Sequence, residues 1–583
     1  MASKEVKTSF ERGTVLFDVE KYNYPQSQAD TLTSLHFFIE KGDIVGLMGP
    51  TGAGKTTSLM LTNGLIPHFL EGNLEGNVIA NSMDTKRYRI QTLSSFIGLV
   101  LQDPETQIFG ITVEKDVAFG PSNLKYDKEK IQKSISDTLK SVGLAGYEKR
   151  LTAELSGGEK QRLAIAGVLA MQPEILVLDE PTSELDPEGR LGIFKLLAEL
   201  KQTRNVTVLV SAHDSEEILQ FVRKLIVLNN GGIAWQGAPD RLFKDIPLTK
   251  KLGIRPPEIA EIGHELSKIG IFKKEDIPLT LDDARRRLSE ILKAKTPVDQ
   301  EEPKSPLKQD RKPVIEISSL HYSYGKKHPA LKGLNLEIYE GEFVALIGKN
   351  GAGKTTFSKH LNGLLRPTSG EIKIYGKNIA GLSIGELSKS VGYVFQNPDH
   401  QIFSSSVREE IEYGLRSYNI SEEEKRKRVA DAIEFVGLTG FEKRHPFTLG
   451  KGERQKLAVA TVLAMEPQIL VIDEPTTGQD WSGTQQMMKM IRQLHQKQHT
   501  ILIITHDMRI AAEYADRVIV FSNGQIELDG IPSRVFSQID KLKACSVSPP
   551  LSAVLAHQLQ PYGMPGGIVT IYEIVQYFSK IAN

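Results

Sequence analysis

Short apolar runs recur along the chain, and each ends where glycine or polar residues begin. In order they are Ile44–Met48, Ile175–Leu178, Val206–Val210, Phe343–Ile347, Ile469–Ile472 and Thr500–Ile504. Apolar runs of this length with such boundaries are typical of buried parallel strands. In open α/β sheets, function gathers at the carboxyl ends of the strands. We therefore predict an α/β fold with sites immediately after these runs.

The whole pattern occurs twice. Lys354 follows Lys55 by 299 residues, and His506 follows His213 by 293. Between these limits, Gln396 and Asp473 each follow their counterparts, Gln102 and Asp179, by 294 residues. Self-similarity at a nearly fixed spacing indicates two homologous repeats.

The repeats predict a division of the chain into five parts. Residues 1–245 form the core domain of the first repeat and residues 246–292 its C-terminal appendage. Residues 314–539 and 540–583 are the corresponding parts of the second repeat. The intervening residues 293–313 contain four prolines, many charges and no aromatic residue, which is typical of a flexible linker.

Composition narrows the possible functions. Seventy-two basic residues balance 72 acidic ones, so the formal charge is zero, which argues against a dedicated nucleic-acid binder. A single cysteine, Cys545, rules out a disulfide framework. We find no run of about 18 apolar residues, so we expect any membrane role to depend on another protein.

A glycine-rich segment follows the first apolar run of each repeat. Gly49-Pro50-Thr51-Gly52-Ala53-Gly54-Lys55-Thr56-Thr57 returns as Gly348-Lys349-Asn350-Gly351-Ala352-Gly353-Lys354-Thr355-Thr356. We call these segments the glycine loops. Between a strand and a helix, such a loop directs backbone N–H groups at a phosphate, while its lysine neutralises phosphate oxygens and its threonine hydroxyl coordinates Mg²⁺. The pattern predicts two ATP sites.

An acidic pair follows the second apolar run of each repeat. Asp179 and Asp473 come directly after the runs, and Glu180 and Glu474 come next. The aspartates are placed to hold Mg²⁺ through water, and the glutamates to polarise the attacking water. An ordinary strand-end salt bridge is the alternative, which the upstream glycine loop disfavours.

Further segments resemble the ATP-binding cassette family. Leu155-Ser156-Gly157-Gly158-Glu159-Lys160-Gln161-Arg162 is similar to its signature motif. Gln102 and Gln396 resemble its glutamine loop, and His213 and His506 its switch histidine. Tyr24 and Tyr324 resemble its adenine-stacking aromatic residue, and Asp186 and Asp480 close the loops after the glutamates.

The resemblance implies two cassette domains in tandem, each with a mostly parallel core sheet, a helical subdomain and a small C-terminal appendage. It also implies head-to-tail pairing within the chain, with each nucleotide between one glycine loop and the other repeat's signature. A Ser-Gly-Gly segment at a helix N-terminus is itself suited to anions, which supports this arrangement.

The motifs and the resemblance together give the following candidate residues. The catalytic candidates are Glu180, Glu474, His213 and His506. The ATP-binding candidates are both glycine loops, Tyr24, Tyr324, Leu155, Ser156, Gly157, Gly158, Glu159, Gly450, Lys451 and Gly452. The Mg²⁺ candidates are Thr56, Gln102, Asp179, Thr355, Gln396 and Asp473.

A narrower resemblance concerns the segments that begin at the two glutamines. Gln102-Asp103-Pro104-Glu105-Thr106-Gln107-Ile108-Phe109 parallels Gln396-Asn397-Pro398-Asp399-His400-Gln401-Ile402-Phe403. We call them the glutamine segments. They are similar to those of energy-coupling-factor importers of vitamins and metal ions. That resemblance implies a transmembrane coupling protein and a membrane substrate-binding subunit as partners, and a peripheral location at the cytoplasmic face of the cell membrane.

The appendages have two interpretations. By resemblance to these importers they hold the two cassettes together. Alternatively, each packs on its own repeat.

The second signature departs from the pattern. Its sequence is Leu449-Gly450-Lys451-Gly452-Glu453, so glycine replaces the serine and lysine the first glycine. Gly450 has no hydroxyl to donate to a γ-phosphate, which predicts two unlike ATP sites. The alternative is that Lys451 replaces the lost contact.

Two other functions compete with transport. Cassette pairs that act on ribosomes usually carry a long charged helical insertion, and DNA-repair or chromosome-organising ATPases a coiled coil or zinc insertion. This linker is short and rich in proline. The glutamine segments favour a membrane partner.

Overall fold

The structure is a computed structural model that describes residues 11–582, except for residues 26, 28, 184, 186, 294–310, 326–327 and 417. Most of the predicted linker and Asp186 therefore lie outside the described residues. The chain divides into two compact units, residues 1–257 and residues 258–583. Each unit is described by itself.

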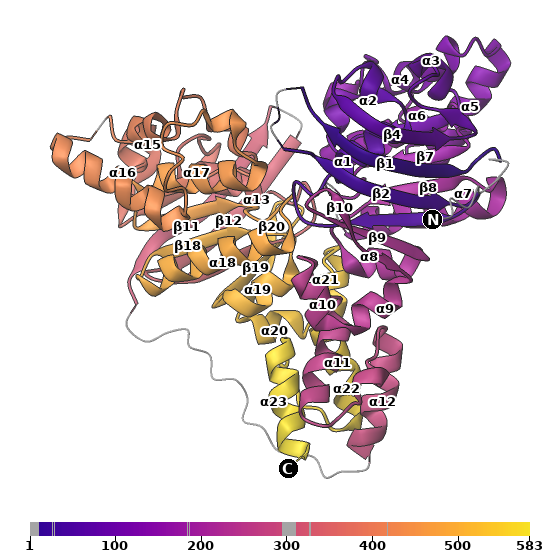
Figure 1. The fold of residues 1–583 in the computed structure, drawn as a ribbon. Coiled ribbons are helices and arrows are strands. Elements are labelled where there is room, and N and C mark those ends of the chain that lie inside the picture. The colour runs from indigo at the N-terminus through magenta and orange to yellow at the C-terminus, as the bar shows by residue number, and fades with distance from the viewer. Residues whose placement is uncertain are drawn as a thin grey trace. The chain divides into compact units, whose positions relative to one another are not determined.

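The first unit contains two sheets (Figure 1). The six-stranded sheet has the order β10-β9-β3-β8-β7-β6, and all its pairs are parallel except β10 with β9. Its strands are β3 (Ile44–Met48), β6 (Ile97–Val100), β7 (Ile175–Leu178), β8 (Thr207–Ser211), β9 (Lys224–Asn229) and β10 (Gly232–Gly237). The antiparallel four-stranded sheet comprises β2 (Leu32–Ile39), β1 (Val15–Asn23), β4 (Asn73–Ala80) and β5 (Met83–Asp84).

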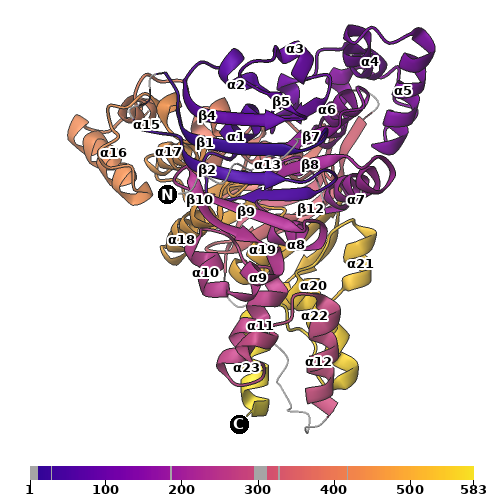
Figure 2. The same cartoon turned by 45° about the vertical axis from the view of Figure 1, so that its right-hand side comes forward.

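Helices cover these sheets and form a separate helical subdomain. The helices of the first unit are α1 (Lys55–Thr62), α2 (Leu65–His68), α3 (Ile90–Leu93), α4 (Val113–Asn123), α5 (Lys128–Ser141), α6 (Gly157–Leu169), α7 (Pro187–Arg204), α8 (Ser215–Phe221), α9 (Pro239–Lys244) and α10 (Ile246–Lys251). Helices α4, α5 and α6 pack together as the subdomain, which Figure 2 shows beside the sheets.

The second unit repeats this arrangement. Its six-stranded sheet has the order β16-β17-β18-β13-β19-β20, with only the β19–β20 pair antiparallel. The strands are β13 (Phe343–Ile347), β16 (Val391–Val394), β17 (Ile469–Asp473), β18 (Thr500–Ile504), β19 (Arg517–Ser522) and β20 (Gln525–Gly530). The four-stranded sheet comprises β12 (His328–Tyr339), β11 (Pro313–Tyr324), β14 (Ser369–Ile374) and β15 (Lys377–Asn378).

The helices of the second unit follow the same plan, with α15, α16 and α17 packed as the helical subdomain. They are α13 (Lys354–Leu361), α14 (Ile384–Leu387), α15 (Val407–Gly414), α16 (Glu422–Val436), α17 (Lys451–Leu463), α18 (Trp481–Gln496), α19 (Met508–Tyr514), α20 (Pro532–Phe536) and α21 (Ile539–Ala544).

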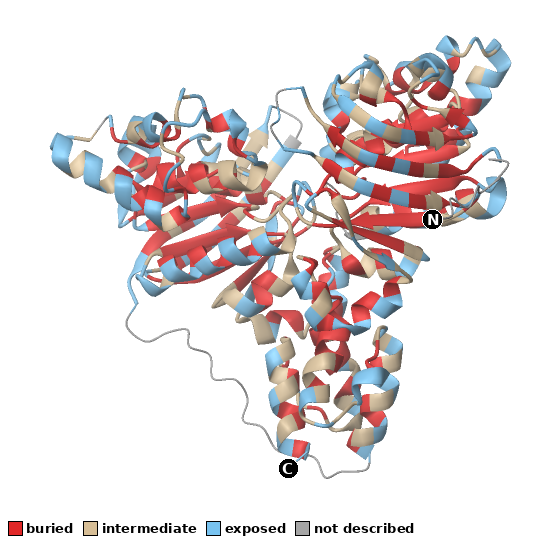
Figure 3. Cartoon of the chain, viewed as in Figure 1, coloured by how far each residue is buried: buried red, intermediate tan, exposed pale blue. Residues whose placement is uncertain are grey.

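Burial explains why the apolar runs form these strands. Every residue of β3, β7, β13 and β18 is buried, and Figure 3 shows both six-stranded sheets buried along their central strands. Strands covered on both faces need apolar side chains at every position. The predicted α/β class and the tandem repeat are confirmed. All six predicted runs coincide with strands of the six-stranded sheets, although Val206 lies one residue before β8.

Four further helices of the second unit form a cluster with its own core. They are α11 (Glu258–Lys268), α12 (Leu281–Lys293), α22 (Leu551–Leu559) and α23 (Ile571–Ala582). Helix α11 packs on α23 and α12 on α22, so helices of the first predicted appendage contact those of the second (Figures 1 and 2). Buried side chains such as Leu288, Leu555 and Phe578 fill the space between them.

Candidate functional site

The glycine loops begin where the central strands β3 and β13 end. Helices α1 and α13 start at Lys55 and Lys354, after Gly54 and Gly353 with φ angles of 95° and 104°. These angles favour glycine, and a Cβ on Gly54 would also lie 2.4 Å from Leu32 Cδ2. The loops can therefore turn tightly into a helix and direct backbone N–H groups at an anion.

The lysine of each loop folds back over the loop itself. Lys55 Nζ donates to Gly49 O at 2.8 Å and to Pro50 O at 3.1 Å. Lys354 Nζ donates to Gly348 O at 2.7 Å, which repeats the geometry. Both side chains are buried, so the ammonium groups are held at the loops and are suited to phosphate oxygens.

The acidic pairs lie at the ends of the adjacent strands β7 and β17. Asp179 accepts hydrogen bonds from Ser211 Oγ at 2.6 Å and from Thr56 Oγ1 at 2.7 Å. Asp473 accepts one from the Tyr393 hydroxyl at 3.1 Å. Burial, with a smaller contribution from the adjacent glutamate, raises the pKa of Asp179 and raises that of Asp473 to about 6.

These residues fit a metal ion that arrives with a nucleotide. Among the described residues, no three His, Cys, Asp or Glu side chains gather as a metal site. Each repeat instead offers one buried aspartate and one threonine hydroxyl, and Asp473 Oδ1 is buried without a hydrogen-bond partner. Mg²⁺ commonly uses one or two carboxylates and takes its other ligands from water and phosphate.

Glutamine, glutamate and histidine converge in each repeat. Glu180 accepts from Gln102 Nε2 at 2.8 Å and lies 2.7 Å from His213 Nε2. For Glu474, the corresponding distances to Gln396 and His506 are 3.0 Å and 2.9 Å.

Both glutamates adopt positive φ angles, 46° for Glu180 and 48° for Glu474, which re-aim the chain at the strand end. Burial would raise the pKa of Glu474, but the His506 contact and the Thr477 hydroxyl outweigh it and lower that pKa. A carboxylate so placed can orient and polarise a water molecule.

The predicted adenine-stacking tyrosines stand beside the glycine loops. The Tyr24 hydroxyl lies 3.1 Å from Thr57 Oγ1, and the Tyr324 hydroxyl lies 3.3 Å from Thr356 Oγ1. Tyr324 remains about half exposed, with 49% of its surface accessible. Its ring is therefore available to stack on a planar ligand.

The two signatures differ in structure as well as in sequence. Ser156 caps α6 in a reciprocal capping box with Glu159, whose Oε2 accepts from Ser156 N at 2.8 Å. Gly450 precedes α17 and keeps only one of the two hydrogen bonds of a capping box. Its backbone N–H donates to Glu453 Oε2 at 2.9 Å. Lys451 lies against Gly478, where an added Cβ would be 2.5 Å from Lys451 Nζ.

The glutamine segments are anchored to the signature helices. Glu105 of η1 (Pro104–Thr106) pairs with Lys160, and Asp399 of η5 (Pro398–His400) pairs with Arg454 at 2.7 Å. Asp103 instead caps η1. Asp399 is thus equivalent to Glu105 in contacts as well as in sequence position. Asp103, although also acidic and in the same motif, has a different role.

The last residue of each glutamine segment forms an exposed aromatic pair with a residue of the following helix, α4 or α15. These pairs were not among the predicted site residues. Phe109 and Phe119 lie 5.9 Å apart between ring centroids, and Phe403 and Tyr413 lie 4.5 Å apart. The exposed fractions of Phe109 and Phe403 are 72% and 61%. Their recurrence at equivalent positions of the repeats was the available sequence signal. Exposed apolar residues clustered in this way indicate a docking surface.

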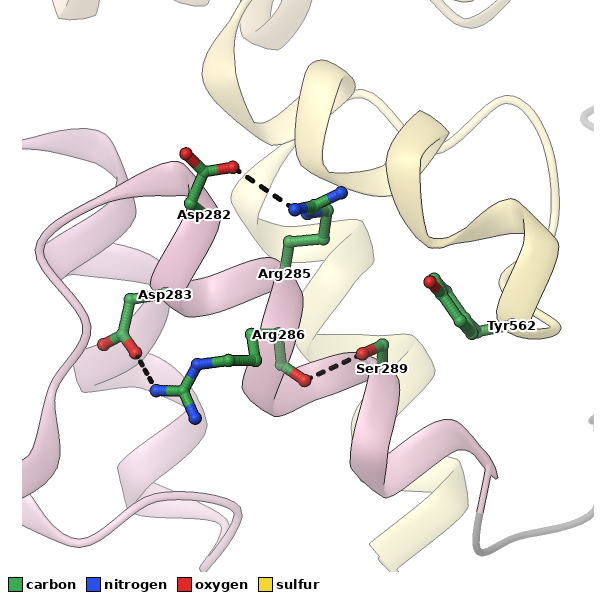
Figure 4. A pocket seen from close by; sticks show the side chains of 6 residues that line it. All are labelled: Asp282, Asp283, Arg285, Arg286, Ser289 and Tyr562. Carbon is green, nitrogen blue, oxygen red and sulfur yellow. Dashed lines mark hydrogen bonds and ion pairs between the residues drawn. The ribbon is translucent and has the colours of Figure 1, made fainter.

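A pocket of about 440 Å³ lies in the four-helix cluster (Figure 4). Asp282, Asp283, Arg285, Arg286, Ser289 and Tyr562 line it. Its two arginines pair with the two aspartates of the same helix, at 3.5 Å and 2.7 Å. The pocket therefore presents locally balanced charge.

Comparison with known proteins identifies the family. The sequence profile described as ABC transporter matches residues 32–183 and 331–477. The chain belongs to this family and carries its ATPase domain twice. The family's domains use ATP, in agreement with the loops and acidic pairs described above.

Several relatives match nearly the whole chain. A protein of Methanosarcina acetivorans named "Putative ABC transporter ATP-binding protein" is 42% identical over 554 residues, 93% of this chain and 90% of the relative. One of Methanosarcina mazei with the same name is 40% identical over 574 residues, 97% of each chain. A solved structure of CbiO1 from Clostridium perfringens, described as part of the ABC transporter complex cbiONQ, is 37% identical and covers 40% of this chain and 95% of its own, with a TM-score of 0.37.

None of the helices among the described residues is long and apolar enough to cross a membrane.

Proposed function

We propose that this chain is the ATP-hydrolysing subunit of an energy-coupling-factor type importer for a vitamin, metal ion or similar small nutrient. Its partners would be a transmembrane coupling protein and a membrane substrate-binding subunit, with the chain at the cytoplasmic face. One observation carries the proposal. Each repeat has a glutamine segment that is anchored to the signature helix, begins with a glutamine that donates to the catalytic glutamate, and ends at an exposed aromatic pair.

In this proposal the described residues bind ATP and activate the water that attacks it. Lys55 and Lys354 neutralise phosphate oxygens, and Tyr24 and Tyr324 stack on adenine. Glu180 and Glu474 orient the attacking water and accept its proton. His213 and His506 contact the γ-phosphate. Each histidine already lies next to the glutamate of its own repeat.

Mg²⁺ would be held by one threonine, one aspartate and one glutamine in each repeat. They are Thr56, Asp179 and Gln102 in the first repeat and Thr355, Asp473 and Gln396 in the second. Mg²⁺ bound with ATP supplies positive charge to the β- and γ-phosphates. The aspartates remain buried acceptors, and the threonine hydroxyl of the first repeat already contacts its aspartate.

The aromatic pairs are the proposed contact with the membrane partner. Phe109 and Phe403 are exposed, yet the backbone behind each is fixed because buried Asp116 and Glu410 accept from the N–H groups of Phe109 and Phe403 at 2.8 Å and 3.0 Å. A rigid apolar contact beside Gln102 or Gln396 can pass a movement of the ATP site to a docked partner.

Co-purification tests this function. Full-length tagged protein extracted from its native membrane in mild detergent should retain polytopic membrane subunits. Phe109→Ser with Phe403→Ser should lose them while binding ATP as before. Tyr572→Ser is a matched control, because Tyr572 is 69% exposed but lies on α23. Equal retention by the aromatic double variant would contradict the proposed surface.

Ribosome binding is the competing outcome. The same extract can be separated on a sucrose gradient after nuclease treatment. Co-sedimentation of the wild-type chain with ribosomal subunits, with no membrane subunit retained, would overturn the importer proposal.

A further inference from the structure

A buried charge cluster joins α19 to the first appendage helix of the unit. Arg509 on α19 donates from its guanidinium to Glu261 Oε2 on α11 at 2.7 Å. The side chains are only 13% and 11% exposed. The two residues are 248 positions apart in sequence, so the pair connects a core domain of one repeat with the appendage of the other.

The cluster extends beyond this pair. Burial by itself would lower the pKa of Arg509, but three surrounding carboxylates outweigh burial and raise it. They belong to Glu258, Glu261 and Glu513. Glu258 also accepts hydrogen bonds from the N–H groups of Leu551 and Ser552, at 3.1 Å and 2.8 Å. The cluster therefore joins α19, α11 and the start of α22.

Helix α19 begins at Met508, two residues after His506. Asp507 caps the helix by accepting from the N–H groups of Arg509 and Ile510, at 3.0 Å and 3.3 Å. His506 is thus separated by one capping residue from a helix whose first turn carries the buried arginine. A shift of α19 relative to α11 would move His506 relative to Glu474.

The first repeat has different residues at the equivalent positions. Glu216 stands where the second repeat has Arg509, and Leu551 and Val554 stand where the first repeat has Glu258 and Glu261. The corresponding helix α8 is tied differently, because Ser215 Oγ donates to the carbonyl of Arg255. The Arg509–Glu261 pair therefore has no sequence counterpart at the helix that follows His213.

We infer that Arg509 is a positioning residue, which through Glu261 fixes helix α19 to the first appendage and so sets the orientation of His506 for ATP hydrolysis. The appendage cluster then acts on one ATP site only. This inference rests on the proposed role of His506. A buried pair that loses one partner leaves an uncompensated charge. Removing Arg509 or Glu261 should therefore weaken the attachment of α19 to α11.

Steady-state ATP hydrolysis by the full-length protein tests the inference. Arg509→Met should lower kcat about tenfold with the KM for ATP unchanged, because a small displacement of a catalytic group costs rate rather than binding. Arg509→Lys, which keeps the charge, should retain activity within about threefold of the wild type. Glu261→Gln, which leaves Arg509 beside Glu258, should lose about threefold and serves if Arg509→Met fails to fold.

Arg517→Met is the matched control. Arg517 lies in the same unit, is 11% exposed and pairs with Glu342 and Asp529, but it is on β19. It should lower the melting temperature while changing kcat less than about twofold. A loss of kcat in Arg509→Met no larger than in Arg517→Met would overturn the inference, as would a change in KM alone.

Hydrogen exchange separates this inference from the proposed ATPase. In Arg509→Met, amides of α19 should exchange faster, while those of α18 should not. Unchanged protection of α19 would overturn the inference even if the variant is less active. A wild-type protein that hydrolyses no ATP would overturn the proposed function, and the exchange data would still decide whether Arg509 fixes α19.

Discussion

Equivalent aspartates are held by different hydroxyl groups in the two repeats. Ser211 donates to Asp179, but its repeat partner is Ile504. Tyr393 donates to Asp473 instead, and its own partner in the first repeat is Leu99. Each buried carboxylate thus keeps a hydroxyl partner from a different neighbouring strand, because an unsatisfied buried acceptor is costly.

Another carboxyl, that of Glu217, is mostly buried and has no equivalent in the second repeat. Thr182 Oγ1 donates to Glu217 at 3.0 Å, and Arg190 lies 3.4 Å from Asp214 and 4.0 Å from Glu217. Burial, together with the charge of Asp214, raises the pKa of Glu217 to about 8 against the opposing effects of Arg190 and Thr182. The repeat partner of Glu217 is Ile510.

The raised pKa predicts how the stability depends on pH. The folded state favours neutral Glu217, so this contribution is fully present below the unfolded pKa of about 4.5 and is lost as the pH rises through about 8. Glu217→Gln keeps an acceptor for Thr182 and removes the titration. Its free energy of unfolding relative to wild type should therefore increase between pH 5 and pH 8 by a few kcal/mol, roughly 1.4 per pKa unit.

Urea unfolding at several pH values measures this difference. Glu129→Gln on the exposed face of α5 is the control for replacing a surface glutamate by glutamine. If the difference in free energy of unfolding between Glu217→Gln and wild type stays constant between pH 5 and pH 8, the prediction is wrong.

At the scale of single elements, the short helices of the glutamine segments depend on the signature helices. Arg454 donates to Asp399 of η5 at 2.7 Å and to the Leu449 carbonyl at 2.7 Å. It therefore fixes η5 against the start of α17. The partly exposed pair contributes little to stability, about 1 kcal/mol or less, but it fixes an orientation.

Charge reversal tests this connection. Asp399→Arg should lower uptake about fivefold while ATP binding is unchanged, because the segment loses its fixed place on α17. Asp399→Arg combined with Arg454→Asp should recover most of the activity. Uptake by whole cells and ATP binding by the purified protein are the two measurements. A single variant that transports like wild type would show that the pair has no role in coupling.

The appendage helices should depend on apolar packing. Leu555 on α22 is fully buried in the core shared with α11, α12 and α23. Leu555→Ala should lower the free energy of unfolding by about 2–5 kcal/mol through lost burial and the cavity left behind. Thermal unfolding monitored by circular dichroism measures the loss. A change below about 1 kcal/mol would indicate that this cluster repacks freely.

Local pattern was enough to predict the strands and glycine loops, but not the contacts between distant segments. Ile44–Met48 is apolar throughout because it is buried on both faces, and this information lies in consecutive residues. The pairing of Arg509 with Glu261 depends instead on how α11 packs against α19. The aromatic pairs similarly needed the three-dimensional positions of Phe109 and Phe119, since only exposure distinguishes them from core residues.

At the scale of the whole molecule, the unlike signatures predict unlike ATP sites. Under the head-to-tail pairing that the family resemblance implies, Ser156 serves the site of Glu474, and Gly450 serves the site of Glu180. A missing hydrogen bond to a charged phosphate costs about 1.5–3 kcal/mol. If it acts mainly in the transition state, the rates should differ roughly tenfold to a hundredfold.

We therefore expect Glu474→Gln to nearly abolish steady-state ATP hydrolysis by the assembled complex, and Glu180→Gln to leave a measurable part. Gly450→Ser with Lys451→Gly should make the two glutamate variants more alike. The side chain of Lys451 lies against Gly478 of its own repeat. Equal losses would mean that Lys451 compensates or that the sites must act together. A greater loss from Glu180→Gln would contradict the asymmetry, because the site without the signature serine would then be the essential one.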